Sequence, residues 1–293
     1  MYLLQQILPA AVIALMVSAG LCGFALYGGK ERAREVVVPF AVGLGYLSGH
    51  LMITGWASFP PTDTTNWLPY FALAAAVLGA FFPEGRASAR SAQEESRASE
   101  TRTWAHRLLF VLVSAGALRL LLKSKFQFSW SLGQGWIWVA CLGGAILLLA
   151  IILEALVRRS AIAGEVPAFL VITCAGTFGA LMLSGSMLLG QFAAVLGAAV
   201  FGSLVFSVRK VSQDRGIVPV FSLLMGTLLV SAYFFAELPA VSAGLLIFAP
   251  AAALVPINIS SKLQAFGLRT ALVSAPVLVA LVLAFRSSPP LSY

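Results

Sequence analysis

Charged side chains are scarce in this chain. Asp, Glu, Lys and Arg make up 10% of its 293 residues, whereas apolar residues make up 60%. A water-soluble domain typically carries about 25% charged residues. The composition therefore excludes an ordinary soluble domain and predicts an all-α, polytopic integral membrane protein.

The residues and motifs that carry most enzyme chemistry are also few. The chain has two histidines and three cysteines. Cys22, Cys141 and Cys174 all lie inside apolar runs without CxxC spacing, which is typical of small buried hydrophobes and not of a disulfide or a metal site. No GxxxxGK[ST], HExxH or glycine-rich dinucleotide motif is present. We therefore expect no enzyme activity, no cofactor and no bound metal.

The basic residues that are present follow a regular arrangement. Lys and Arg number 19 against 11 acidic residues, which gives a net charge of +8. Most of them fall in every second gap between the apolar runs, and Lys and Arg are retained on the cytoplasmic side during membrane insertion. Orientation and contact with anionic lipid headgroups thus explain the positive charge, and we expect no nucleic-acid binding. The residues in these gaps are Lys30, Arg32, Arg34, Arg86, Arg90, Arg97, Arg102, Arg107, Arg158, Arg159, Arg209, Lys210, Arg215, Lys262 and Arg269.

The apolar runs predict ten membrane-spanning helices, because each approaches the roughly 20 residues needed to cross a bilayer. With the basic gaps inside, both termini are expected to be non-cytoplasmic, in a cell membrane. Residues 84–103 predict a solvated cytoplasmic linker, and the fourth segment, which contains Arg119, is either a short span or a tilted, partly interfacial helix. The predicted segments are 7–27, 36–58, 67–82, 104–122, 134–157, 166–187, 191–208, 217–235, 240–257 and 268–285.

The two halves of the chain, 1–160 and 161–293, share small motifs in the same order. A Pro-Ala pair followed by two glycines occurs in the first and sixth segments. A proline, a phenylalanine and two leucines precede a Phe-Phe pair in the third and eighth segments. Five spans per half would give the halves opposite orientations, an inverted repeat typical of secondary transporters. The alternative is chance similarity between apolar helices of similar composition.

His50 is the strongest candidate for chemistry inside the membrane, because ionisable residues there are costly and often functional. Tyr46 and Thr54 share its face at helical spacing. His50 could relay a proton or hydrogen-bond a substrate. Its alternative role is structural, as a hydrogen-bond donor to a carbonyl of a neighbouring helix.

The ninth segment is the most irregular. It contains Pro250 and Pro256, and Asn258 follows. Proline removes backbone donors, and broken helices near the midplane often build transporter sites, so these three residues are candidates for substrate binding. The alternative places Pro256 and Asn258 at the cytoplasmic end and leaves Pro250 as an ordinary kink.

The repeat and the broken ninth segment together favour a secondary-transporter-like protein that moves a small or apolar solute through the lipid bilayer. The scarcity of charge inside the membrane favours another function, a structural or accessory subunit that scaffolds a membrane complex. Its protein partners, like the solute, are not specified by the sequence.

Overall fold

The computed structural model describes residues 2–27, 31–56, 59–61, 63–81, 94–160, 162–207, 215–257, 259 and 261–287. Every regular element within these ranges is a helix. Eight of the helices are long and apolar enough to cross a membrane. The elements are α1 (Tyr2–Tyr27), α2 (Glu31–Thr54), η1 (Thr65–Trp67), α3 (Leu68–Phe81), α4 (Glu94–Leu121), α5 (Lys123–Phe128), α6 (Leu132–Arg159), α7 (Glu165–Leu183), α8 (Met187–Ser207), α9 (Ile217–Phe235), α10 (Ala240–Phe248), η3 (Ala249–Leu254) and α11 (Lys262–Ser287).

Each of the ten predicted segments overlaps a helix, and the prediction of an all-α membrane protein is confirmed in this respect. Two of the helices are shorter than the eight long ones. α3 has 14 residues, which correspond to about 21 Å at 1.5 Å per residue. α10 continues directly into the 3₁₀-helix η3, and the two together extend about 26 Å, because a 3₁₀-helix rises about 2 Å per residue.

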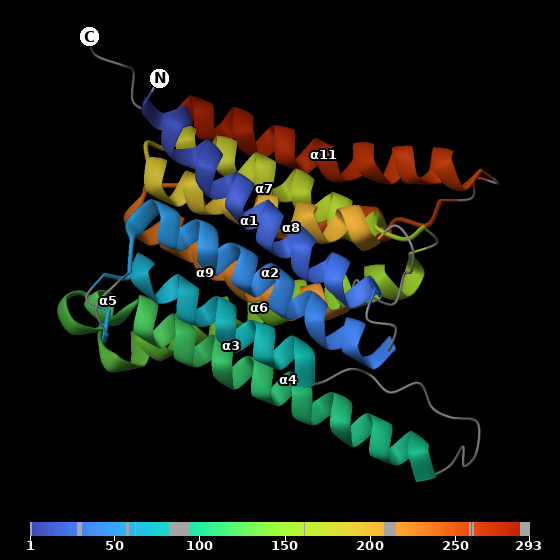
Figure 1. The fold of residues 1–293 in the computed structure, drawn as a ribbon. Helices are drawn as coiled ribbons and strands as arrows, with labels where there is room; N and C mark the ends of the chain where they lie inside the picture. The colour runs from blue at the N-terminus through green and yellow to red at the C-terminus, as the bar shows by residue number, and fades with distance from the viewer. Residues whose placement is uncertain are drawn as a thin grey trace.

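The second half of the segment 84–103, predicted as a solvated and at most transiently helical linker, belongs to a regular helix. Residues 82–93 lie outside the described part of the chain, but α4 already begins at Glu94 and runs without a break to Leu121. Glu, Ala and Arg, which are frequent in this stretch, are good helix formers, so the apolar span extends backward into a polar helix. In Figure 1 the first turns of α4 project past the neighbouring helices.

The helices run mostly antiparallel, and the start of α1 and the end of α11 lie at the same end of the bundle (Figure 1). We call this the aromatic end, because α5 and the aromatic residues Phe126, Trp130, Trp138 and Phe234 cluster there. The opposite end, where α4, α7 and α11 begin and α6 ends, is the basic end. It carries Arg107, Arg158, Arg159 and Arg269.

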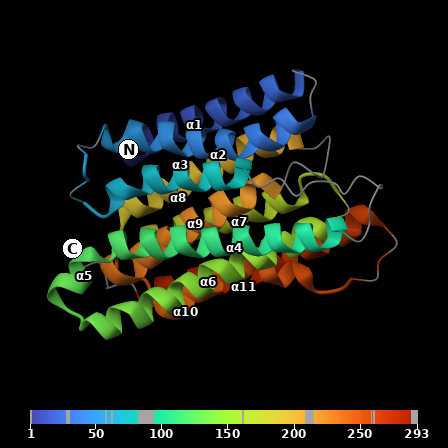
Figure 2. The ribbon, with the colours of Figure 1, turned by 90° about the horizontal axis from the view of Figure 1, so that it is seen from below.

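α9 forms the centre of the bundle. Every residue from Ile217 to Ala232 is buried, and α9 contacts α2, α3, α4, α6, α7, α8 and α10. In Figure 2, α1 and α2 lie on one side of the molecule and α6, α10 and α11 on the other, with α7, α8 and α9 between them. The hydroxyls of Thr227 and Ser231 donate to carbonyls one turn earlier in α9, so these polar side chains are satisfied within their own helix.

Small residues bring α2 close to its neighbours. A Cβ added at Gly45 would lie 2.8 Å from the carbonyl oxygen of Ala14 in α1, and one at Gly49 would lie 2.6 Å from Val195 in α8. With their spacing of four residues, the two glycines form a small-xxx-small motif, which lets helix backbones approach closely. α2 is therefore fixed between α1 and α8.

Ion pairs join helices at the basic end. Glu165, at the start of α7, pairs with Arg269 of α11 at 2.8 Å. Glu154 of α6 also lies near Arg158, one turn later in the same helix. That contact is 3.9 Å, and the shorter one is the 3.2 Å hydrogen bond that Arg107 of α4 donates to Glu154. The polar ends of α4 and α6 are thus linked across the helices as well as along α6.

The three cysteines are free. Cys22 and Cys174 are buried as expected, but Cys141 is exposed on the surface of α6. The expectation of burial was wrong for Cys141 because α6 is apolar on its outer as well as its inner face, and hydropathy alone does not distinguish the two.

Candidate functional site

α2 places Tyr46, His50 and Thr54 on one stripe, as their spacing of four residues predicts. Their burial differs along the stripe. Tyr46 and His50 are buried, with exposed fractions of 0% and 1%, whereas Thr54 at the end of the helix is exposed. The stripe therefore leads from the bundle interior to the aromatic end.

The imidazole of His50 lies against Phe192 of α8. The two rings are stacked, with centroids 4.2 Å apart and planes inclined by 18°, and the ring of Tyr46 lies 5.8 Å from that of His50. Both Nδ1 of His50 and the hydroxyl of Tyr46 are buried without a hydrogen-bond partner. A buried polar group that lacks a partner costs about 1–3 kcal/mol, so this pair is an uncommon feature of a packed interior.

His50 also lines a pocket between the end of α2 and the start of α3, which we call the His50 pocket. Its volume is about 90 Å³. Its polar side chains are those of His50, Thr54, Asn66 and Tyr70, and Asp, Glu, Lys and Arg are absent from its described lining. The lining residues are Leu47, His50, Leu51, Thr54, Gly55, Trp56, Asn66, Pro69, Tyr70 and Leu73.

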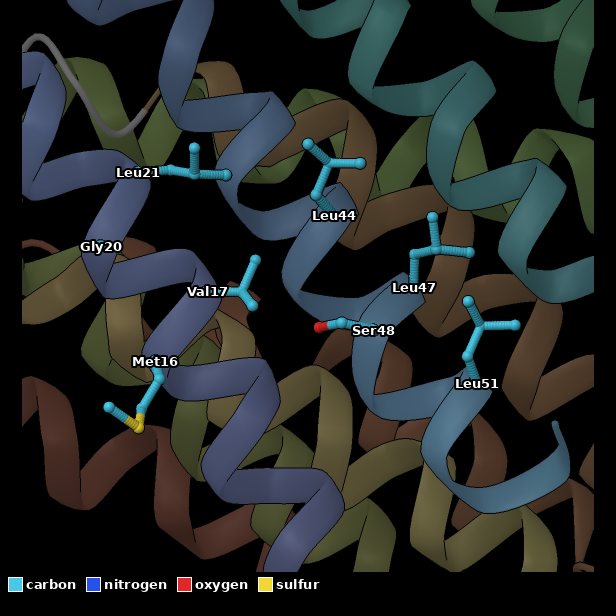
Figure 3. A pocket seen from close by; sticks show the side chains of 8 residues that line it. All are labelled: Met16, Val17, Gly20, Leu21, Leu44, Leu47, Ser48 and Leu51. Carbon is cyan, nitrogen blue, oxygen red and sulfur yellow. The ribbon is translucent and has the colours of Figure 1, made fainter. Parts of the chain in front are cut away.

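A second space, the α1–α2 groove, is larger and open on one side. Its volume is about 590 Å³, and Figure 3 shows Val17 and Leu21 projecting from α1 toward α2, with the hydroxyl of Ser48 pointing back toward α1. That hydroxyl already donates to the carbonyl of Gly45 at 2.8 Å. The groove is otherwise apolar. It is lined by Met16, Val17, Gly20, Leu21, Leu44, Leu47, Ser48 and Leu51.

The predicted break in the ninth segment is present. The α-helix ends at Phe248, and the chain continues as η3, in which Pro250 is buried. Arg159 at the end of α6 donates a 3.2 Å hydrogen bond to the carbonyl of Leu254, so a basic side chain satisfies a carbonyl at the end of η3. Pro256 follows as an exposed residue, and Asn258 lies outside the described residues.

The structure does not bring all the candidate residues together. Tyr46, His50 and Thr54 lie on the part of α2 that approaches the aromatic end, whereas Pro256 follows η3 at the basic end. η3, with Pro250, packs against α6, α7 and α11. The proline residues and His50 therefore belong to two separate places in the fold.

Sequence reasoning missed several residues that complete the His50 pocket. Asn66 and Tyr70 come from α3 and the turn before it, and Phe192 comes from α8. No local spacing connects these residues with His50, because the contacts depend on how three helices pack. Leu47 and Leu51, in contrast, lie within one turn of His50 and could have been found from helical periodicity alone.

No group of three or more His, Cys, Asp or Glu side chains within the described ranges could hold a metal ion. Searches with protein-family models, against curated proteins and against solved structures found no match for this chain. Its class therefore follows from composition and fold alone. With eight helices long and apolar enough to cross a bilayer, it is a helical, multi-pass membrane protein.

Proposed function

We propose that this protein is a secondary-transporter-like carrier in the cell membrane that moves a small or apolar solute, with His50 at the binding site. The observation that carries the proposal is the His50 pocket itself. It joins a buried imidazole, whose Nδ1 has no partner, to a cavity near the aromatic end. An ionisable residue with unsatisfied hydrogen-bonding capacity inside a membrane protein is a typical feature of a substrate or proton pathway.

The topology that we propose has ten spans, with α3 and the α10–η3 unit added to the eight long helices, and both termini non-cytoplasmic. An even number of crossings agrees with the position of the start of α1 and the end of α11 at the same end (Figure 1). The basic end then faces the cytoplasm. The His50 pocket accordingly opens toward the outer side.

We also propose that the two halves form an inverted repeat. Part of the packing supports it. The α1–α2 contact has a counterpart in α7–α8, the α4–α6 contact has one in α10–α11, and the halves meet through α2–α8 and α3–α9. The symmetry is incomplete, because the extensive α1–α8 and α7–α11 contacts have no counterpart of similar extent in α2–α7 and α1–α6. Repeats that meet in this way place a substrate site at their interface, and His50 of α2 packs on Phe192 of α8.

The charged contacts at the basic end fit an outward-facing carrier. Glu165 and Arg269 link α7 to α11, Arg107 and Glu154 link α4 to α6, and Arg159 holds the end of η3. These contacts would close the basic end, while the His50 pocket lies near the other. Alternating access would require the opposite arrangement in a second conformation.

A second function, scaffolding of a membrane complex without transport, is favoured by a different observation. α9 fills the centre of the bundle, with every residue from Ile217 to Ala232 buried. A solid core of this kind suits a rigid structural subunit. The two functions differ in whether purified protein alone moves a solute.

Uptake into proteoliposomes distinguishes them. We expect protein-dependent uptake of at least one member of a panel of small polar, apolar and amphipathic solutes, and loss of that uptake in His50→Leu, which preserves an apolar side chain against Phe192. The matched control is His106→Leu, which makes the same change in α4 near the basic end and should retain uptake. Asn258→Ala tests the remaining candidate of the ninth segment.

Two results would contradict the proposal. Unchanged uptake in both His50→Leu and Asn258→Ala would refute the proposed site. Absence of uptake for the whole panel, together with stable partner proteins that copurify in mild detergent, would establish the scaffold function instead. Single cysteines at Asp63 and Ser129, introduced into a variant without the three native cysteines and labelled from each side of sealed vesicles, would test whether α3 crosses the membrane. The ten-span topology places them on the same side, whereas an α3 that does not cross would place them on opposite sides.

A further inference from the structure

We infer that the His50 pocket and the α1–α2 groove together bind one single-chain amphiphile, whose uncharged, hydrogen-bonding head lies at His50 and whose apolar tail lies in the groove. This inference rests on the proposed function and names its substrate class. It also makes a claim about binding that can be tested without transport.

The two spaces adjoin each other along α2. Leu47 and Leu51, both half-buried, line the groove as well as the pocket, so the two spaces share part of the surface of α2. The chemistry on the two sides differs. The side chains around the pocket include an imidazole, two hydroxyls and an amide, whereas the only side-chain hydroxyl around the groove, that of Ser48, is already bonded within α2. A ligand that fills both spaces would therefore have hydrogen-bonding side chains near one of its ends only.

The depth of the two spaces matches the orientation of an amphiphile in a bilayer. The pocket reaches Trp56 and Asn66, which lie beyond the last residue of α2, at the level where aromatic side chains mark the membrane interface. The groove extends from Leu51 to Leu44, which lie three and ten residues from the end of α2 at Thr54. At 1.5 Å per residue this is about 5–15 Å from that end, within one leaflet of a hydrocarbon core about 30 Å thick.

The lining of the pocket also specifies the charge of the head. Since the pocket residues include no Asp, Glu, Lys or Arg, a phosphate or ammonium head would lose its hydration without gaining a counter-charge, which is strongly unfavourable. A hydroxyl or amide head, in contrast, can hydrogen-bond the polar side chains there. His50 is 1% exposed, and its Nδ1 has no protein partner. The structure therefore favours an alcohol or an amide over a phospholipid.

Gly20 provides a way to fill the groove without disturbing the fold. It is exposed, it lines the groove, and a Cβ added to it would meet no atom within 4 Å. Gly116 of α4 is also exposed, and its Cβ position is equally open, but it does not line the groove. Gly20→Phe and Gly116→Phe are thus a matched pair of substitutions on the outer surface of the bundle.

The experiment uses the full chain in nanodiscs and hexadecanol that carries a photoreactive diazirine in its chain. After irradiation, mass spectrometry of peptides should locate the label on α1 and α2 within the groove. We expect Gly20→Phe to reduce this labelling about tenfold and Gly116→Phe to leave it nearly unchanged. Unlabelled hexadecanol should compete better than hexadecane or hexadecyl phosphate. This preference for the alcohol should be lost in His50→Leu.

Several outcomes would overturn the inference. Label spread evenly over the outer helices of the unsubstituted protein would show ordinary lipid contact, and this result does not depend on any variant. Stronger competition by hexadecyl phosphate than by hexadecanol would show that the site prefers a ligand with a charged head. Label at the groove that is unaffected by Gly20→Phe would show that the chain does not lie between α1 and α2. Crosslinking of two protein copies through residues of the groove would show that a second copy of the chain, and not an amphiphile, occupies the groove.

Failure of the inference and failure of the proposed function can be distinguished. Groove labelling that depends on Gly20, without uptake of any solute, supports the amphiphile site and contradicts transport. Uptake of a water-soluble solute that depends on His50 but is unaffected by Gly20→Phe supports transport and contradicts the amphiphile.

Discussion

The Glu165–Arg269 pair allows a sharp test of what holds the basic end together. The carboxylate side chain is 3% exposed and that of Arg269 is 19% exposed, with 2.8 Å between Oε1 and Nη1. The hydroxyl of Ser160 donates a second hydrogen bond to Oε2 at 2.9 Å. Glu165→Gln keeps the size of the side chain but leaves the guanidinium without its counter-charge. Because the pair is largely buried, we expect the free energy of unfolding to fall by about 3 kcal/mol.

Glu154→Gln is the matched control. Glu154 pairs with Arg107 at 3.2 Å, but these side chains are 26% and 28% exposed, so water screens the interaction. Exposed pairs contribute about 0.2–1 kcal/mol, and we expect a cost of at most about 1 kcal/mol. The same chemical change should thus cost about 2 kcal/mol more in α7 than in α6, because burial differs while the pairing is similar.

Unfolding by titration with sodium dodecyl sulfate, followed through tryptophan fluorescence, measures both variants against the unsubstituted protein. The double variant Glu165→Gln/Arg269→Gln removes the unpaired charge and should be more stable than Glu165→Gln alone. Equal costs for Glu165→Gln and Glu154→Gln would refute the argument from burial. A double variant whose cost equals the sum of the two single costs would show that the residues do not interact.

Two further predictions concern packing and use the same unfolding assay. Gly49→Ala should destabilise the protein by about 1–3 kcal/mol, because its Cβ would lie 2.8 Å from the backbone carbonyl of Ala10 and α1 would have to move, whereas Gly20→Ala should be neutral or slightly stabilising. Equal effects would show that the helix contact is not close. Cys174→Leu should destabilise by a similar ~1–3 kcal/mol because the residue is buried, while Cys141→Leu on the outer surface should stay within about 0.5 kcal/mol; the reverse order would contradict the assigned faces of α6 and α7.

Apolar runs were sufficient to predict the long helices, because span length depends on local composition. The orientation that the basic gaps indicate stays a prediction. Apolar runs were insufficient for the boundaries where a polar sequence continues a helix. α4 begins at Glu94, well before its apolar part, since helix propensity and not hydropathy determines that start. α5 was missed for a related reason. It lies in the polar gap between the segments predicted at 104–122 and 134–157, where Phe126 packs against Trp130 and Trp136.

The central position of α9 could not be predicted from the sequence. Its composition resembles that of the other apolar helices, and the arrangement of helices depends on which faces pack together, which hydropathy does not record. For the same reason, the candidate site could be predicted only in part. His50 stands out as an ionisable residue in an apolar run, but its partners Asn66, Tyr70 and Phe192 become neighbours only when α2, α3 and α8 pack. The pairing of Glu165 with Arg269, 104 positions apart in sequence, likewise has no local signal.

The packed centre and the proposed carrier function are reconciled by the nature of the ligand. A water-soluble solute would need a hydrated path through the bundle, and α9, with Ile217 to Ala232 buried, occupies the place where such a path would run. An amphiphile needs no path for its tail, which stays in lipid while only the head crosses. The His50 pocket and the open α1–α2 groove lie on the same stretch of α2, on either side of Leu47 and Leu51, so head and tail can occupy them together. For this class of ligand, a solid core is compatible with the transport that we propose.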